Sequence, residues 1–378
     1  MQMKTYLFQD KSWNEDLDRS LDSENTLIIL FACTQMKDIK EGIDDIVRIY
    51  PKSTVIGSST PAEIYENEIL YNSITMAILR FDTSHFKLIV KDIEEANSYE
   101  VGKEIVNDLP KDNLKSIFVL ANVLNTNGSE LTKGLSENIP KNCVIAGGLV
   151  GDGVDFNKTW LIINSKIMNK EICAVGLYGN NLQVHYGCKN GWTRFGFDRH
   201  VTHSENNILY SLDNKPALEL YKRYLGEYAS ELPLSGLYFP LMLHEDASRE
   251  PKLRSVKAIN EKENSIIFAG NIPQNSIVSF GRTNLDDLIK SSQEATECLI
   301  QDYDKEQKAL CIGISGVGRK FVLKQEAEDE IEAVSYALSS NISTVGFYSY
   351  GQISKLPSGG CDFHNQTMTL LLIYEMEN

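Results

Sequence analysis

The sequence lacks the features that would tie the chain to a membrane or to an oxidising compartment. No apolar run approaches the roughly 20 residues that a membrane-spanning helix needs, and residues 1–12 lack the apolar stretch of a signal peptide. The seven cysteines are scattered, odd in number and never spaced C-x-x-C, which disfavours a disulfide framework and a zinc ribbon. We therefore expect reduced thiols, a cytoplasmic location, no metal ion and no cofactor.

Basic residues are scarce relative to acidic ones. The chain has 37 Lys and Arg against 52 Asp and Glu, which gives a net charge of −15. Such a chain repels nucleic acid and anionic membranes, so we expect neither as a partner. Its 378 residues, 42% of them hydrophobic, suffice for a sizeable core in two or three domains.

Strand and helix patterns recur in the same order along the chain. A buried strand at 27–32 is followed by a helical stretch, a strand entering a small-residue turn at 54–60, and an alternating strand at 74–78. The same order returns over 116–187 and over 309–374. We predict a mixed α/β fold in which repeated strand–helix–strand–strand units form mixed sheets covered by helices.

The pattern changes after about residue 205, where polar residues cluster before a helix. Pro216 suits the first turn of that helix. We place a boundary here, between an N-terminal module at 24–210 and a C-terminal module at 216–378. The linker is short and polar, with no long Gly/Ser or Pro tract, so we expect the two modules to dock together.

Two glycine-rich segments look like nucleotide-binding loops but lack the residues that nucleotide chemistry needs. Residues 313–318 have the G-x-x-x-x-G spacing, but Arg319 and Lys320 follow where a Lys and a hydroxyl residue are required. The next run, 321–323, looks like a strand. Residues 146–153 do not follow G-x-G-x-x-G. A turn that presents Arg319 fits the first segment better.

A nucleophilic enzyme is the alternative reading. Cys361, Asp362 and His364 place a thiol, a carboxylate and an imidazole within four residues. A hydrolase or acyl transferase would use Cys361 or Ser59 with a histidine held in hydrogen-bond reach. Neither nucleophile lies in a G-x-S-x-G elbow, which counts against this alternative.

The segment 191–196 (Gly-Trp-Thr-Arg-Phe-Gly) joins an indole, a hydroxyl and a guanidinium between glycines. This mixture suits a small molecule with a carboxylate, because Arg pairs with the carboxylate and Trp packs on the apolar part. The other interpretation is a turn between domains in which Arg194 forms a salt bridge.

Taken in order, several segments of the chain resemble the FIST family of intracellular signal-transduction sensory domains. They are residues 55–64, 146–153, 216–226, 346–353 and 364–370. The most specific part is Gly-Phe-Tyr-Ser-Tyr-Gly at 346–351, followed by Asn-Gln-Thr-Met-Thr at 365–369. Gln352 stands where the family usually has Glu, and Gly316 stands where a Cys is expected.

The resemblance implies a sensory protein that recognises small molecules such as amino acids and has no established catalytic chemistry. Family members are often fused to kinase, chemoreceptor or cyclic-dinucleotide output domains. We therefore expect no enzyme activity, and signalling in trans through a separate protein of one of these kinds. Because clefts concentrate where modules meet, we expect the ligand there. The candidate contacts are Arg194 and Arg282 for an anionic group, Trp192 and Tyr348 for packing, and Glu63, Asp152, Asn365 and Thr367 for polar contacts.

Overall fold

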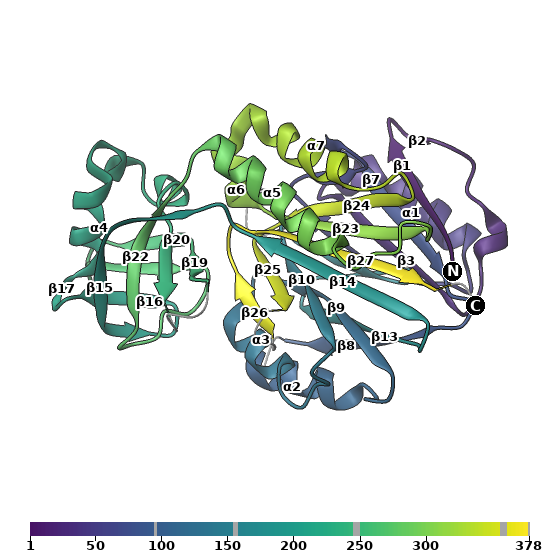
Figure 1. Ribbon diagram of the computed structural model, residues 1–378, viewed down its shortest axis with the longest axis horizontal. Coiled ribbons are helices and arrows are strands. Elements are labelled where there is room, and N and C mark those ends of the chain that lie inside the picture. The colour runs from purple at the N-terminus through teal and green to yellow at the C-terminus, as the bar shows by residue number, and fades with distance from the viewer. Residues whose placement is uncertain (94–96, 154–157, 245–249, 356–360, 377–378) are drawn as a thin grey trace.

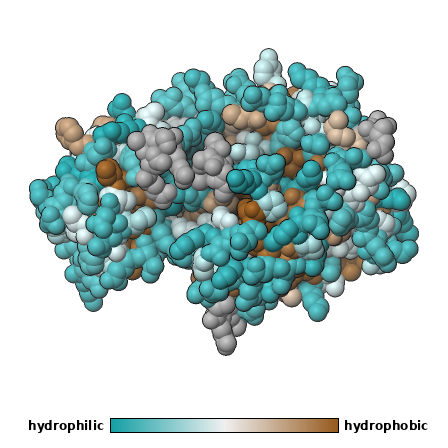
Figure 2. Space-filling model, turned by 60° about the horizontal axis from the view of Figure 1, so that its bottom comes forward, coloured by the Kyte–Doolittle hydropathy of each residue, from teal (hydrophilic) through white to brown (hydrophobic). Residues whose placement is uncertain are grey.

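The chain folds into a large body of three mixed sheets with a small lobe at one end (Figure 1). The computed structural model describes residues 1–93, 97–153, 158–244, 250–355 and 361–376. Hydrophilic residues cover most of the face in Figure 2, and hydrophobic residues show there only in small areas. Within the described ranges no helix is both long and apolar enough to cross a membrane.

Three units with the same strand pairing build the large body. Each has two parallel strands joined by a helical connection, with a third strand antiparallel to the first. In the first unit these are β3 (Thr26–Cys33), α1 (Met36–Ile49), β4 (Thr54–Thr60) and β7 (Ile74–Arg80). In the second they are β9 (Leu114–Asn122), α3 (Gly128–Leu135), β10 (Val144–Val150) and β13 (Glu171–Tyr178). In the third they are β23 (Ala309–Gly316), α6 (Val317–Leu323), α7 (Ala327–Ala337), β24 (Ile342–Ser349) and β27 (Met368–Glu375). The predicted mixed α/β fold with repeated units is confirmed.

Each unit also lends a hairpin to the sheet of another unit. The hairpin of β5 (Glu63–Tyr65) and β6 (Glu68–Leu70) leaves the first unit and pairs with β24 of the third. The hairpin of β11 (Leu161–Ile163) and β12 (Lys166–Met168) pairs with β4, and that of β25 (Gly351–Lys355) and β26 (Cys361–His364) pairs with β10. This cyclic exchange ties the three sheets together.

Outer strands and further helices complete the large body. The strands are β1 (Gln2–Gln9), β2 (Ser12–Trp13), β8 (His85–Asp92) and β14 (Leu182–Lys189), and the helices are α2 (Ser98–Asp108) and α5 (Leu285–Ile300). Helix α5 lies on β14 and β27. It comes so close that a Cβ on Gly187 of β14 would lie 1.9 Å from the carbonyl oxygen of Ala295. Only glycine allows this approach.

The main hydrophobic core sits between the three sheets. It contains buried residues from each of them, among them Leu27, Phe118 and Leu310. The rings of Phe31 and Phe347 stack with centroids 4.4 Å apart, which joins the first unit directly to the third. Burial of apolar surface from all three units therefore holds the body together.

The small lobe is inserted between β14 and α5. Its strands are β15 (Thr193–Glu205), β16 (Ile208–Leu212), β17 (Lys215–Pro216), β18 (Leu241–His244), β19 (Lys252–Arg254), β20 (Val256–Asn260), β21 (Ser265–Phe268) and β22 (Ile277–Arg282), with α4 (Ala217–Leu225) packed on them. Strand β15 pairs with β22, so strand pairing crosses the boundary between 24–210 and 216–378. That division of the chain stays a prediction, and it does not coincide with the lobe.

Candidate functional site

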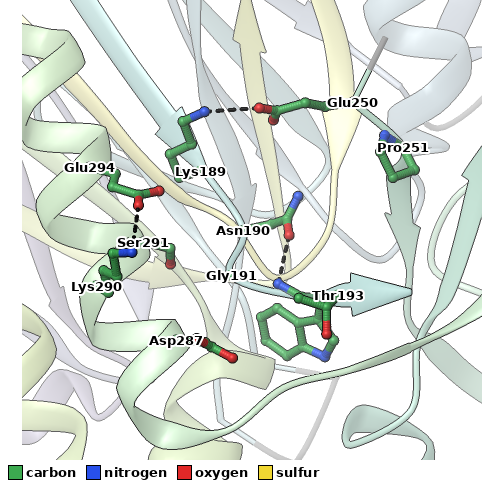
Figure 3. Close-up of a pocket in the computed structure, with 11 residues that line it drawn as sticks. Lys189, Asn190, Gly191, Thr193, Glu250, Pro251, Asp287, Lys290, Ser291 and Glu294 are labelled. Carbon is green, nitrogen blue, oxygen red and sulfur yellow. Dashed lines mark hydrogen bonds and ion pairs between the residues drawn. The ribbon is translucent and has the colours of Figure 1, made fainter. Parts of the chain in front are cut away.

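A pocket of about 330 Å³ opens where the small lobe joins the large body (Figure 3). One wall is the end of β14 and the link that follows it. A second wall is the first turns of α5, and the third is the segment 250–251 of the lobe. The lining residues are Lys189, Asn190, Gly191, Trp192, Thr193, Glu250, Pro251, Asp287, Lys290, Ser291 and Glu294.

Capping interactions at the start of α5 fix the floor of the pocket. The side-chain oxygen of Asn284 accepts a hydrogen bond from the Asp287 N–H at 2.7 Å, as an N-cap residue does. The Thr283 hydroxyl donates to the Gly191 carbonyl at 2.7 Å. Gly191 has φ +79°, and a Cβ there would lie 2.7 Å from the Asp287 carbonyl oxygen. The two links between lobe and body are therefore held side by side.

The pocket presents charges of both signs. Lys189 Nζ lies 2.8 Å from Glu250 Oε1, and this hydrogen bond raises the Lys189 pKa. On α5, Lys290 Nζ lies 3.6 Å from Glu294 Oε1. Asp287 accepts an N–H of the Asn284 side chain at 2.9 Å and has no basic partner within the described ranges. The lining therefore contains one more acidic than basic residue.

Arg319 connects these walls to the interior. Its guanidinium is completely buried and donates to the carbonyls of Asn190 (2.6 Å) and Leu288 (2.8 Å) and to the Ser292 hydroxyl (2.9 Å). It also pairs with the buried carboxylate of Glu330. The residue lies on α6, so the strand expected at 321–323 is wrong. This run is helical because Val322 and Leu323 pack into the hydrophobic cluster beneath α5 and α7.

Of the eight predicted contacts, Trp192 lines the pocket. Arg194 instead pairs with Asp198 at 2.9 Å and is about half exposed, so it forms a salt bridge, but within strand β15 and not in a turn between domains. The Arg282 guanidinium lies 5.3 Å from the centre of the exposed Phe195 ring. Neither arginine lines the pocket.

Three other predicted contacts lie inside the large body. The Tyr348 hydroxyl donates to Glu330 Oε2 at 3.2 Å. Glu63 is buried and accepts from the Ser73 hydroxyl at 2.7 Å, and its burial raises its pKa to about 8. Asp152 accepts from the Tyr350 hydroxyl at 2.8 Å.

The last two predicted contacts lie on the loop between β26 and β27. Asn365 accepts from the Ser255 N–H of the lobe at 3.2 Å, and Thr367 donates its N–H and hydroxyl to Gln352 Oε1. The Gln352 amide also donates to the Ser349 hydroxyl at 2.6 Å. The Gln352 amide thus both donates and accepts hydrogen bonds, whereas the carboxylate of a glutamate at this position could only accept them. The structure does not bring the eight residues together.

The sequence reasoning missed the charged lining, because only the fold brings Lys189, Glu250 and Asp287 to one place. A partial signal was present in the chain. Asn284 is a good N-cap residue, and Lys290 and Glu294 are spaced one helical turn apart.

The geometry does not support the nucleophilic alternative. The Ser59 hydroxyl is buried and accepts a hydrogen bond from the Trp160 N–H. Burial raises the pKa of the Cys361 thiol, which contacts the Asp362 carbonyl. Neither group forms a hydrogen bond with a histidine among the residues that the structure covers, and the same residues contain no cluster of three metal-ligating side chains.

Comparison with known families identifies the chain. Residues 26–215 match the FIST N domain, and residues 217–355 match the FIST C domain. The uncharacterized protein MJ1623 of Methanocaldococcus jannaschii is 23% identical over 409 positions, which span 96% of this chain and 76% of that relative. The protein therefore belongs to the FIST family, whose domains are sensory domains of signal transduction.

Proposed function

We propose that this protein is a cytoplasmic sensor that binds an amino acid or a similar small carboxylate in the pocket between the small lobe and the large body. The observation that carries the proposal is the charged lining: Lys189 and Lys290 face Glu250, Asp287 and Glu294 around one cavity. Cavities of this size with a few convergent polar groups are typical small-molecule sites.

The lining suits both ends of an amino acid. A carboxylate pairs with a lysine, and an ammonium group pairs with Asp287, whose oxygens otherwise receive only the Asn284 amide within the described ranges. Trp192 supplies an apolar surface for the rest of the ligand.

The family membership supports a role in signalling. FIST domains are sensory, so binding is expected to reach an output protein. We propose that this output is a separate kinase, chemoreceptor or cyclic-dinucleotide enzyme, reached in trans.

A thermal-shift screen with the standard amino acids tests the binding proposal. A ligand at about 100 times its Kd stabilises the native state by roughly 2.7 kcal/mol. Asp287→Asn should lower the affinity for the selected compound by roughly 10-fold or more, since it removes a charged hydrogen-bond partner. Glu328→Gln, an exposed change on α7, is the control for net charge and should leave affinity unchanged. Equal effects of both variants would contradict the placement of the site.

A further inference from the structure

The pocket lies on the joint between the small lobe and the large body. Residues 190–192 carry the chain into the lobe, and residues 283–284 carry it back. The Thr283 hydroxyl ties the two links together through the Gly191 carbonyl. A change in the contacts of the pocket therefore acts directly on this joint.

One ion pair of the pocket spans the two parts of the molecule. Lys189 is the last residue of β14 in the large body, and Glu250 lies two residues before β19 in the lobe. Their charged atoms are 2.8 Å apart and face each other in Figure 3, with side-chain exposures of 30% and 65%. Ion pairs this exposed stabilise a protein only slightly, so a ligand with the same two charges can replace them.

The second ion pair of the pocket provides a natural comparison. Lys290 and Glu294 are both on α5, one turn apart, so their ion pair lies within that helix and does not cross from body to lobe. The two pairs line the same cavity with the same charges. They differ in whether they link the lobe to the body.

We propose that Lys189 and Glu250 select a ligand that carries both a carboxylate and an ammonium group, and that they exchange their ion pair for contacts to it. The ligand carboxylate pairs with Lys189, and the ligand ammonium group pairs with Glu250 and Asp287. The bound ligand then connects Lys189 and Asp287 of the body with Glu250 of the lobe, so it takes over the link that the ion pair made, adds a contact to α5, and tightens the joint. This inference rests on the pocket being the ligand site.

Two backbone amides report on the joint. The Ser255 N–H of the lobe donates to the Asn365 side-chain oxygen of the body at 3.2 Å. The Asn271 N–H of the lobe donates to the Ser129 hydroxyl of α3 at 3.0 Å. Both hydrogen bonds break when the lobe moves away, so amide hydrogen exchange at these positions measures its opening.

The first arm of the test needs no ligand. In Glu250→Gln, amides 255 and 271 should exchange about two- to fivefold faster than in wild type, the range expected for loss of an exposed ion pair. Glu294→Gln removes the same charge from the same pocket and should leave both rates unchanged. Equal rates in the two variants would overturn the assignment of the pair as a link between lobe and body.

The second arm uses the standard amino acids, with acetate and methylammonium as probes of a single charge. A bound amino acid should slow exchange at both amides in wild type, because it connects lobe and body, and this slowing should be lost in Glu250→Gln. A bound amino acid that speeds exchange at these amides, or acetate acting as well as an amino acid, would overturn the exchange of ion pairs. If no amino acid binds, the proposed function and the proposed exchange of ion pairs are both wrong. The first arm still decides whether the Lys189–Glu250 pair links the lobe to the body.

Discussion

The guanidinium of Arg319 and the carboxylate of Glu330 form an ion pair in which both side chains are completely inaccessible to solvent. The remaining polar atoms of the pair also form hydrogen bonds. Glu330 accepts hydrogen bonds from Ser315 and Tyr348, and Arg319 donates to carbonyls at the wall of the pocket. A buried pair of this kind depends on all its partners, because a lone buried charge is very unfavourable.

Removing one member of this pair should therefore be severe. We expect Arg319→Met or Glu330→Gln to lower the free energy of unfolding by about 3–5 kcal/mol. The double variant should lose less than the sum, since no uncompensated charge remains. Denaturant unfolding measures each value. Asp44→Asn, which breaks the exposed pair with Lys40, is the control and should cost at most about 1 kcal/mol.

Glu63 should make stability depend on pH. Its pKa is about 8 in the folded protein and 4.5 unfolded, because burial disfavours the carboxylate. The folded state then holds the proton more tightly, so stability is lost as pH rises through this window. His364 has the opposite effect between about 4 and 6.5, since burial lowers its pKa to about 4. Between pH 6.5 and 8 His364 no longer contributes to the pH dependence, so this range shows the effect of Glu63.

Within this range the free energy of unfolding should fall by up to about 2 kcal/mol. Glu63→Gln keeps a polar group of the same shape and should abolish that fall. Unfolding curves of both proteins at several pH values provide the comparison. A wild-type curve as flat as that of the variant would show that Glu63 is already ionised at pH 6.5.

Gly346 and Gly313 lie opposite each other in the parallel pair β23–β24 and should respond differently to substitution. A Cβ on Gly346 would lie 2.1 Å from the Gly313 carbonyl oxygen, closer than any real contact. A Cβ on Gly313 would meet only side-chain atoms at 3.7 Å and beyond. We expect Gly346→Ala to destabilise by roughly 1–3 kcal/mol, and Gly313→Ala to be tolerated. Thermal unfolding of the two variants decides, and equal midpoints would contradict the packing.

The Arg194→Ala variant distinguishes the ligand contact predicted from the sequence from the site proposed in the pocket. If Arg194 pairs with a ligand carboxylate, Arg194→Ala should weaken binding roughly 10- to 150-fold. The structure pairs it with Asp198 at the surface instead, so we expect less than about a twofold change. Calorimetric titration with the compound selected by the thermal screen distinguishes these outcomes, and a large loss would restore Arg194 to the site.

Local patterns in the sequence identified the repeated units. Runs such as 27–32 and 309–314 are continuously apolar because both faces of their sheets are covered, and this marks them as buried strands whatever their neighbours are. The segments around Tyr348 and Asn365 were enough to place the chain in its family. The exchange of hairpins between units left no such mark, since strand pairing over long separations is not encoded in periodicity.

The pocket is a product of the tertiary structure. Trp192 was identified from its neighbours in the chain, but the charges beside it come from residues 189, 250 and 287–294, which only the inserted lobe and α5 bring together. Side-chain chemistry likewise suggested that Arg194 and Arg282 would face a ligand, and the folded chain gives each another contact. The sequence determined strands, helices and family because these depend on local pattern, and the fold decided the site because it depends on which distant side chains meet.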